Sequence, residues 1–168
     1  AAVGPNLAAP GAQVVEAQGA PLTPTLFGGI TDIGLEEVSG ESTTVDSSQA
    51  LGAGTKEMTV RPEFDVTLAY NPASVLLPVA RVEGLGWTML SAGATEGGSI
   101  IGGQGGVVRL DGSLDPIGPR ALFVSIGSGA ASMTGNSRAA QWMILDQLVD
   151  EARGRMSPDS KFALLTPA

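Results

Sequence analysis

The sequence predicts an α/β protein, and two segments carry this prediction. Residues 73–82 place apolar side chains at helical spacing, and after Gly84 an apolar strand is expected at residues 85–92. A helix, a short glycine loop and a strand form the repeating step of a parallel α/β sheet or barrel. The second segment, residues 23–34 (TPTLFGGITDIG), is short, apolar and rich in β-branched residues, so it predicts another buried strand.

Composition limits the class of protein. A chain of 168 residues is long enough for one domain with a core, and its 43% hydrophobic content argues against disorder throughout. The net charge of −8, with no basic cluster, argues against nucleic acid as a partner. No apolar run approaches the roughly 20 residues of a membrane span. Glycine is about twice as frequent as usual, which favours tight loops over long helices.

The sequence has no cysteine and no histidine. Disulfides and thiolate metal sites are therefore excluded, and the commonest zinc ligand and general base are missing. The first twelve residues lack a basic region followed by a long apolar region, so they do not predict a signal peptide. A processed N-terminus would look the same, and the compartment is not defined by these features.

The N-terminal third is expected to hold two strands. Residues 13–17 (QVVEA) predict a short strand that ends at the turn Gln18-Gly19. Within residues 23–34, Gly28 and Gly29 would weaken a strand unless another backbone or a ligand comes close. A carboxylate at Asp32, near the end of an apolar run, must be paired, hydrated or bound.

The middle of the chain alternates loops with one helix. Residues 39–54 predict a solvated loop, with a lid over the strand ends as the functional alternative. Residues 56–60 are a strand or loop rim, and residues 64–70 a short helix or strand. Asn71 should cap the helix that follows, Pro78 should distort or restart it, and Gly84 should end it.

Glycine dominates residues 93–106, which predict tight turns between strands. The alternative of a phosphate cradle lacks the Lys-Ser/Thr pair of a P-loop. Short strands are expected at residues 107–110 and 121–126, with a turn at Asp111-Gly112.

The C-terminal third predicts the strongest helix. Asn136 should cap it and Gly154 should end it. One face carries an apolar stripe that is expected to pack on a sheet, or to stay half exposed without a cover: Trp142, Leu145, Leu148, Val149 and Ala152. Residues 162–165 are apolar, and residues 166–168 look like the start of a further helix, which suggests a fragment.

Three stretches together resemble the amidohydrolase superfamily. Residues 23–34 are similar to its first barrel strand, roughly TPGLIDAHTHLG, with matches at Thr23, Pro24, Leu26, Thr31 and Gly34. Residues 71–92 are similar to the second barrel unit. Residues 100–112 (IIGGQGGVVRLDG) resemble a signature of imidazolonepropionase-related members and are the most specific match.

The resemblance implies a fold and a domain plan. The fold class is α/β, a partial (β/α) TIM-like barrel preceded by the end of a small β-sandwich. Residues 1–22 would be the end of that β-sandwich and a linker, and residues 23–168 the N-terminal part of the barrel. A complete barrel needs about 250 residues, so the chain resembles a fragment. A periplasmic or secreted location is favoured by the same resemblance.

The resemblance also implies what the site lacks. The two metal-binding histidines of the family's first strand fall on Ile30 and Asp32. Isoleucine binds no metal, and one aspartate cannot replace two imidazoles. A structural or paired Asp32 is therefore expected. The family uses zinc, but no cofactor is predicted in this chain. Gln104 would lie in a loop near the strand ends, where it could touch a ligand. Asp32 and Gln104 are therefore the candidate ligand-binding residues.

Nucleophilic catalysis has no support in the sequence. A Ser-His-Asp triad is impossible without histidine, and no spacing brings Lys56 or Lys161 to a serine.

Two function hypotheses remain, with a weaker third. The first is an amidohydrolase-like protein, related to metal-dependent C–N bond hydrolases, whose segment lacks the histidine ligands and is not catalytic alone. The second is an active amidohydrolase whose catalytic ligands lie in sequence outside this chain. The third is an extracellular β-rich binding module. The expected partners are a second copy, another chain, or the missing C-terminal part.

Overall fold

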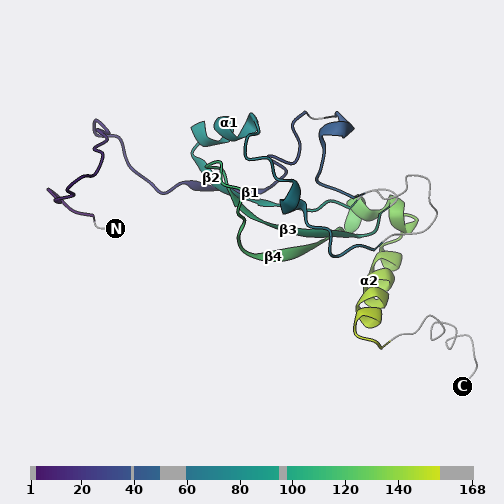
Figure 1. Ribbon diagram of the computed structural model, residues 1–168. Coiled ribbons are helices and arrows are strands. Elements are labelled where there is room, and N and C mark those ends of the chain that lie inside the picture. Colours follow the sequence, from purple (N-terminus) through teal and green to yellow (C-terminus); the bar gives the residue numbers. More distant parts are fainter. Residues whose placement is uncertain (1–2, 39, 50–59, 95–97, 156–168) are drawn as a thin grey trace, which may run out of the picture.

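The computed structural model describes residues 3–38, 40–49, 60–94 and 98–155. Within these ranges four strands form one open sheet in the order β1-β2-β3-β4 (Figure 1). The strands are β1 (Leu26–Thr31), β2 (Leu85–Leu90), β3 (Ile101–Arg109) and β4 (Ile117–Val124). The same ranges contain two α-helices, α1 (Leu76–Val82) and α2 (Arg138–Ala152), and several short 3-10 turns. The predicted α/β class is confirmed at this level.

The sheet is mixed in direction. β1 and β2 are parallel and are connected through α1, which is the predicted α-to-β step. β3 runs antiparallel to β2, and β4 runs antiparallel to β3. The turn at Asp111-Gly112 follows β3 at once and leaves no room for a crossover helix, so β3 and β4 form a hairpin. Within the described ranges the sheet is neither all-parallel nor closed into a barrel.

One face of the sheet carries the core. Leu90, Val108 and Leu110 point to this face and pack with Leu77 and Ala80 of α1. The remaining members of the core come from the segments that follow β1 and β2 and from the segment before α1: Leu35, Ala92, Val66 and Tyr70. Figure 1 shows α1 on this side of the sheet. Thr88 is also fully buried, because alternate residues of β2 point to the same face.

The opposite face of the sheet is left open by the described residues. Trp87 and Met89 alternate with the buried residues of β2, and Trp87 remains 39% exposed. The rings of Phe27 and Trp87 stack with their centroids 4.6 Å apart. Val107 and its cross-strand neighbour Ile117 continue this apolar surface onto β3 and β4. We call this surface, formed by Phe27, Trp87, Met89, Val107 and Ile117, the open face.

The expected strand at residues 23–34 forms, but it is not buried. β1 lies at the edge of the sheet with β2 as its one described partner, and Ile30 is 66% exposed. The prediction of a buried strand was wrong because no described element lies beyond β1. The close neighbour expected at Gly28 and Gly29 is not found: a Cβ on Gly28 would make an ordinary contact, 3.5 Å from the carbonyl oxygen of Trp87, and nothing lies within 4 Å of the Cβ position of Gly29.

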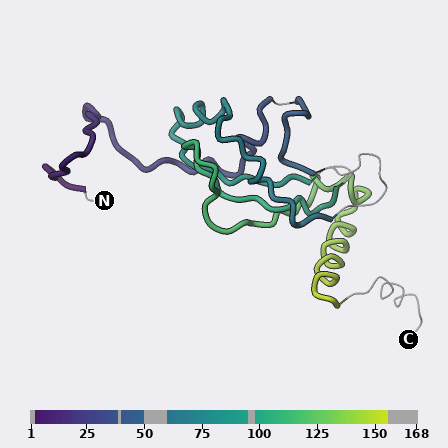
Figure 2. The backbone as a smooth tube through the Cα atoms, viewed as in Figure 1, coloured from purple at the N-terminus to yellow at the C-terminus, as the bar shows by residue number. Residues whose placement is uncertain are grey.

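The strand expected at residues 13–17 is absent. These residues belong to an exposed arm that runs away from the sheet and pairs with no described strand (Figure 2). The assignment of residues 1–22 to the end of a β-sandwich stays a prediction.

The glycines of residues 101–106 lie within β3, so the prediction of tight turns was wrong for them. Glycine is needed here because neighbouring strands approach too closely for a side chain. A Cβ on Gly105 would collide with the carbonyl oxygen of Leu90 and would lie 2.7 Å from the ring of Phe123. A Cβ on Gly102 would lie 2.5 Å from the carbonyl oxygen of Ala92.

Helix α1 begins later than its sequence suggests. The Asn71 side chain accepts a hydrogen bond from the backbone of Ala73 in a turn, and Ser74 Oγ accepts one from Leu76 at the start of the helix. Pro78 consequently sits in the first turn, where its missing N–H has no intrahelical partner to lose. The expected distortion at Pro78 is avoided in this way. Gly84 ends the segment with φ +85°, as predicted.

Helix α2 is capped by Ser137 rather than Asn136 and leads away from the sheet (Figure 1). The buried side chain of Gln141 connects the helix to the preceding loop. It accepts a hydrogen bond from the N–H of Gly127 and donates one to the carbonyl oxygen of Gly127. The apolar stripe does not pack on the sheet, and Trp142 is 56% exposed. The predictions for residues 56–59 and 162–168 concern positions outside the described residues.

No described helix is long and apolar enough to cross a membrane.

Candidate functional site

The carboxyl ends of β1 and β2 meet at a small recess of about 220 Å³. Ile30, Thr31 and Asp32 line it from the end of β1, and Ser91 lines it from the residue after β2. The wall between them is completed by Ser47 and Gly93. Ligands of open α/β sheets and α/β barrels bind at the carboxyl ends of parallel strands, so this is the expected place for a site. We call it the Asp32 recess.

A turn directly after β1 sets the position of Asp32. Its carbonyl oxygen accepts hydrogen bonds from the backbone of Leu35 at 2.8 Å and of Glu36 at 3.1 Å. The turn requires Gly34, which has φ +81° and where a Cβ would lie 2.7 Å from the Tyr70 ring. The Asp32 side chain is exposed at the recess. Of the three states that the sequence allowed for this carboxylate, hydration matches the observed exposure.

Two threonine hydroxyls join the strands that carry the recess. Thr88 Oγ1 lies 2.8 Å from Thr31 Oγ1 and donates to the carbonyl oxygen of Gly29 at 2.8 Å. Because Thr88 is fully buried, these bonds are shielded from competing water. They fix the relative positions of the carboxyl ends of β1 and β2.

The loop after β1 supplies the third wall. The N–H of Gly93 donates to the carbonyl oxygen of Ser47 at 2.7 Å, and Ser48 forms a parallel bridge with Gly93. Ser47 belongs to residues 39–54, for which a solvated loop and a lid were both expected. It lies beside the strand ends, residues 39 and 50–54 lie outside the described residues, and the choice between the two stays a prediction. Neither Ser47 nor Ser91 was recognised from the sequence, because isolated serines carry no periodic or motif signal.

Gln104 is not brought to the Asp32 recess. It lies within β3 opposite Leu122, and its side-chain amide donates to the carbonyl oxygen of Pro62 at 3.1 Å. Its backbone N–H donates to Phe64 at 2.6 Å. In this structure Gln104 therefore holds the segment before the 3-10 turn Val66–Ala69 against the sheet. Its assignment to a loop was wrong, and a role in ligand binding stays a prediction.

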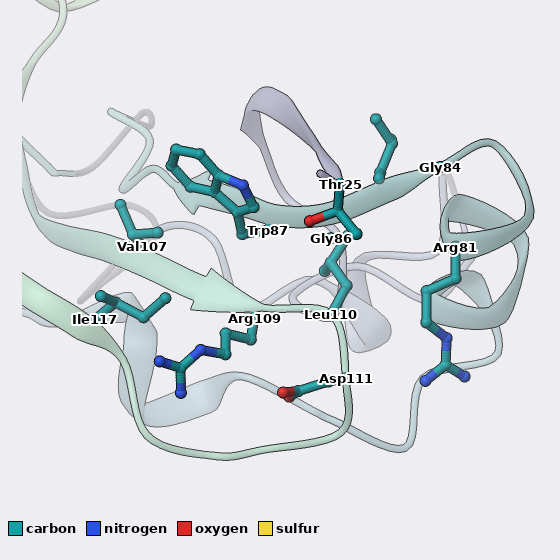
Figure 3. A pocket seen from close by; sticks show the side chains of 11 residues that line it. Thr25, Arg81, Gly84, Gly86, Trp87, Val107, Arg109, Leu110, Asp111 and Ile117 are labelled. Carbon is teal, nitrogen blue, oxygen red and sulfur yellow. The ribbon is translucent and has the colours of Figure 1, made fainter. Parts of the chain in front are cut away.

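A larger cavity of about 710 Å³ opens at the other end of the sheet. Figure 3 shows Trp87, Val107 and Ile117 on one side of it and Arg81 on the other, with Arg109 and Asp111 at its edge. It lies at the amino ends of β1 and β2, where Trp87, Val107 and Ile117 of the open face come near Arg81 of α1 and Leu110 of the core. Its lining is mostly apolar and it is distant from the carboxyl ends of the parallel strands, so we interpret it as a continuation of the open face around the end of the sheet.

The residues at the Asp32 recess do not fit the zinc ion that the family resemblance implies. Zinc in proteins is held by several nitrogen, sulfur or oxygen ligands in tetrahedral geometry. Asp32 is the one carboxylate that lines the recess. In the part of the chain that the structure describes, no three histidine, cysteine or acidic side chains gather closely enough to share an ion.

Comparisons with known proteins support the fold. No protein-family model and no curated protein sequence matches the chain. The crystal structure of an amidohydrolase from Thermotoga maritima MSB8 is similar, with a TM-score of 0.72 and 21% sequence identity. The match covers 91% of this chain and 40% of that chain. At this identity the likeness establishes a shared fold, and the chain spans less than half the length of the protein that it matches.

Proposed function

We propose that the chain is the N-terminal part of an amidohydrolase-like (β/α) barrel protein, in which it supplies scaffold and one wall of the site rather than metal ligands. The observation that supports this proposal is that the carboxyl ends of the parallel strands β1 and β2 lie side by side at the Asp32 recess. The segment that contains them is similar in fold to part of an amidohydrolase structure. The activity of the whole protein would then be related to C–N bond hydrolysis.

The proposal includes the loss of the family's first metal-binding pair. The positions that match it are Ile30, whose side chain cannot bind an ion, and Asp32, which stands without a second acidic or imidazole neighbour in the recess. A hydrolase of this class needs a metal-bound water whose pKa is lowered to about 7. If the protein is active, the ligands come from sequence beyond this chain, and this is the alternative function.

The open face supports a proposal about partners. A contiguous apolar surface of this kind is normally covered in a stable protein. Among the described residues β1 pairs with β2 alone, so a further strand can add to its other edge. We therefore propose that further polypeptide, from a second copy, another chain or the rest of the same protein, packs against the open face.

The experiment that separates the two functions is metal analysis of the full-length protein together with an assay for amide hydrolysis. Absence of stoichiometric zinc, with no chelator-sensitive hydrolysis, is expected for a structural or regulatory protein. Stoichiometric zinc with hydrolysis abolished by chelation would establish the alternative. In that case Asp32→Asn should leave the zinc content unchanged, with Asp115→Asn as the matched control on the β3–β4 hairpin. Loss of zinc in Asp32→Asn alone would overturn the proposal that this segment supplies no ligand.

A further inference from the structure

We propose that the larger cavity, at the amino ends of β1 and β2, binds a small aromatic carboxylate. Such a site lies at the opposite end of the sheet from the Asp32 recess, so it is independent of metal binding and hydrolysis there. The class of ligand follows from the size of the cavity, from the side chains that share one face of the sheet, and from the charge of the lining.

The cavity has the size of a small-molecule site. Its volume of about 710 Å³ falls within the roughly 300 to 1,000 Å³ that is usual for ligand pockets. Such pockets are mainly apolar, and a few polar groups in them set the orientation of the ligand. The lining here fits this description, because apolar side chains and glycines predominate and the charged groups are Arg81, Arg109 and Asp111.

The strand register places an aromatic ring and a guanidinium side by side. Arg109 is the direct cross-strand partner of Trp87, and such partners point to the same face of a sheet. Val107 lies two residues before Arg109 on this face, and Ile117 is paired with Val107. The intervening Val108 is fully buried on the opposite face, as strand alternation requires. Figure 3 shows the four side chains of the exposed face at the cavity.

Trp87 gives the site its preference for an aromatic ligand. Its ring is 39% exposed, and the stacked ring of Phe27 holds it in position before a ligand arrives. A ligand ring can stack against the indole or meet it edge to face, which adds to the gain from burying apolar area. Val107 and Ile117 supply further apolar surface beside it. A site whose walls are already in place loses little conformational freedom on binding.

The charge of the lining favours an anion, although the whole chain is acidic. The net charge of the chain is −8, yet the cavity gathers two arginines, Arg81 from the last turn of α1 and Arg109 from β3, against one aspartate. The Asp111 carboxylate already accepts hydrogen bonds from the backbone and the hydroxyl of Ser113. Among the described residues neither Arg81 nor Arg109 forms an ion pair. Their planar guanidinium groups can therefore donate paired hydrogen bonds to a ligand carboxylate.

The test uses the full-length protein with phenylacetate, 2-phenylethanol, 2-phenylethylammonium and acetate as probes, and follows the backbone amide shifts of Trp87, Val107 and Arg109. We expect phenylacetate to bind at least about tenfold more tightly than the other three, because it alone combines a ring with a charged acceptor for guanidinium. Its affinity should fall as ionic strength rises, since both arginines are exposed. Equal binding of 2-phenylethanol would overturn the inference. So would the absence of phenylacetate binding, which is the result if other polypeptide fills the cavity in the whole protein.

Matched variants connect the binding to the two arginines. Arg109→Gln and Arg81→Gln should each weaken phenylacetate binding by about fivefold or more and leave 2-phenylethanol binding unchanged. Arg138→Gln, at the exposed start of α2, is the control and should change neither. Arg109→Gln keeps the contact with Tyr70, because the Tyr70 hydroxyl donates to the backbone carbonyl oxygen of residue 109. An unchanged phenylacetate affinity in both folded arginine variants would refute the inference.

Discussion

The guanidinium of Arg120 on β4 donates a 2.8 Å hydrogen bond from Nε to the Asp65 carboxylate, across the face of β3. Asp65 is the N-cap residue of the 3-10 turn Val66–Ala69, and its other carboxylate oxygen accepts hydrogen bonds from the backbone N–H and the hydroxyl of Thr67. Both partners of the ion pair are mostly buried. One carboxylate thus joins the hairpin to the turn that covers the core.

This pair predicts a pH-dependent stability. Partial burial raises the pKa of Asp65, but the hydrogen bonds from Thr67 and Arg120 outweigh it and hold the pKa below its usual value. Stability from a lowered carboxyl pKa is present above the unfolded value and is lost as pH falls through the folded value. Between neutral pH and about pH 3, the free energy of unfolding should therefore decline less steeply in Asp65→Asn than in the wild type. Urea unfolding across this range measures the difference, and Asp115→Asn should behave as wild type.

Substitution of Gly105 should be costly. Gly105→Ala places a methyl group against the Leu90 carbonyl and the Phe123 ring, and neither the strand backbone nor the packed ring can move freely. We expect a loss of about 2 kcal/mol or more in the free energy of unfolding. Gly129→Ala is the matched control, because nothing lies within 4 Å of its Cβ position. Equal stability of the two variants would contradict the close approach of β2 and β3.

Thr88 should stabilise the folded protein through the hydrogen bonds of its hydroxyl rather than through the volume of its side chain. Thr88→Val removes the bonds to Thr31 and to the carbonyl of Gly29 while keeping the volume, and should cost about 1 to 3 kcal/mol. Thr88→Ser keeps the hydroxyl and should retain the amide shifts of the Asp32 recess. Thermal or urea unfolding together with these shifts separates the two effects. A harmless Thr88→Val would show that the two strands are aligned by other contacts.

The single tyrosine of the chain is a direct probe of the core. Burial, reinforced by the negative charge of Asp111, raises the pKa of Tyr70 above its usual value, and its hydroxyl donates to the Arg109 carbonyl at 2.9 Å. The ultraviolet absorbance of phenolate in the 168-residue chain should therefore appear at higher pH than in free tyrosine. Tyr70→Phe should cost about 1 kcal/mol of stability. Titration at the ordinary pKa would show that this part of the core is open to water.

The parallel pair and its connecting helix were predictable because local signals agree there. Gly84 marks the end of α1, and the apolar residues that follow form β2. The hairpin was harder to predict. The glycines of β3 fit a strand because the backbone of Leu90 and the ring of Phe123 pack closely against it, and both belong to neighbouring strands that local sequence does not reveal. β1 was predicted to be buried because its side chains are apolar. Burial also requires elements that pack against the strand, and among the described residues β1 has a strand partner on one edge alone.

The candidate site was predictable in part. Asp32 stood out as a carboxylate at the end of an apolar run, and it does line a recess. Ser47 and Ser91 reach the same recess through the loop and the strand end, and no sequence pattern links them to Asp32. Gln104 was singled out by its glycine-rich surroundings, but those glycines serve the packing of β3 against β2.

The antiparallel hairpin has a practical consequence. Because β3 reverses direction relative to β2, the connection at residues 110–116 lies at the end of the sheet opposite the Asp32 recess. Asp111, Leu114 and Asp115 are exposed there. An affinity tag or fluorescent label introduced at this connection would report on the protein without crowding the recess, and the same connection is where inserted sequence would be best tolerated during evolution.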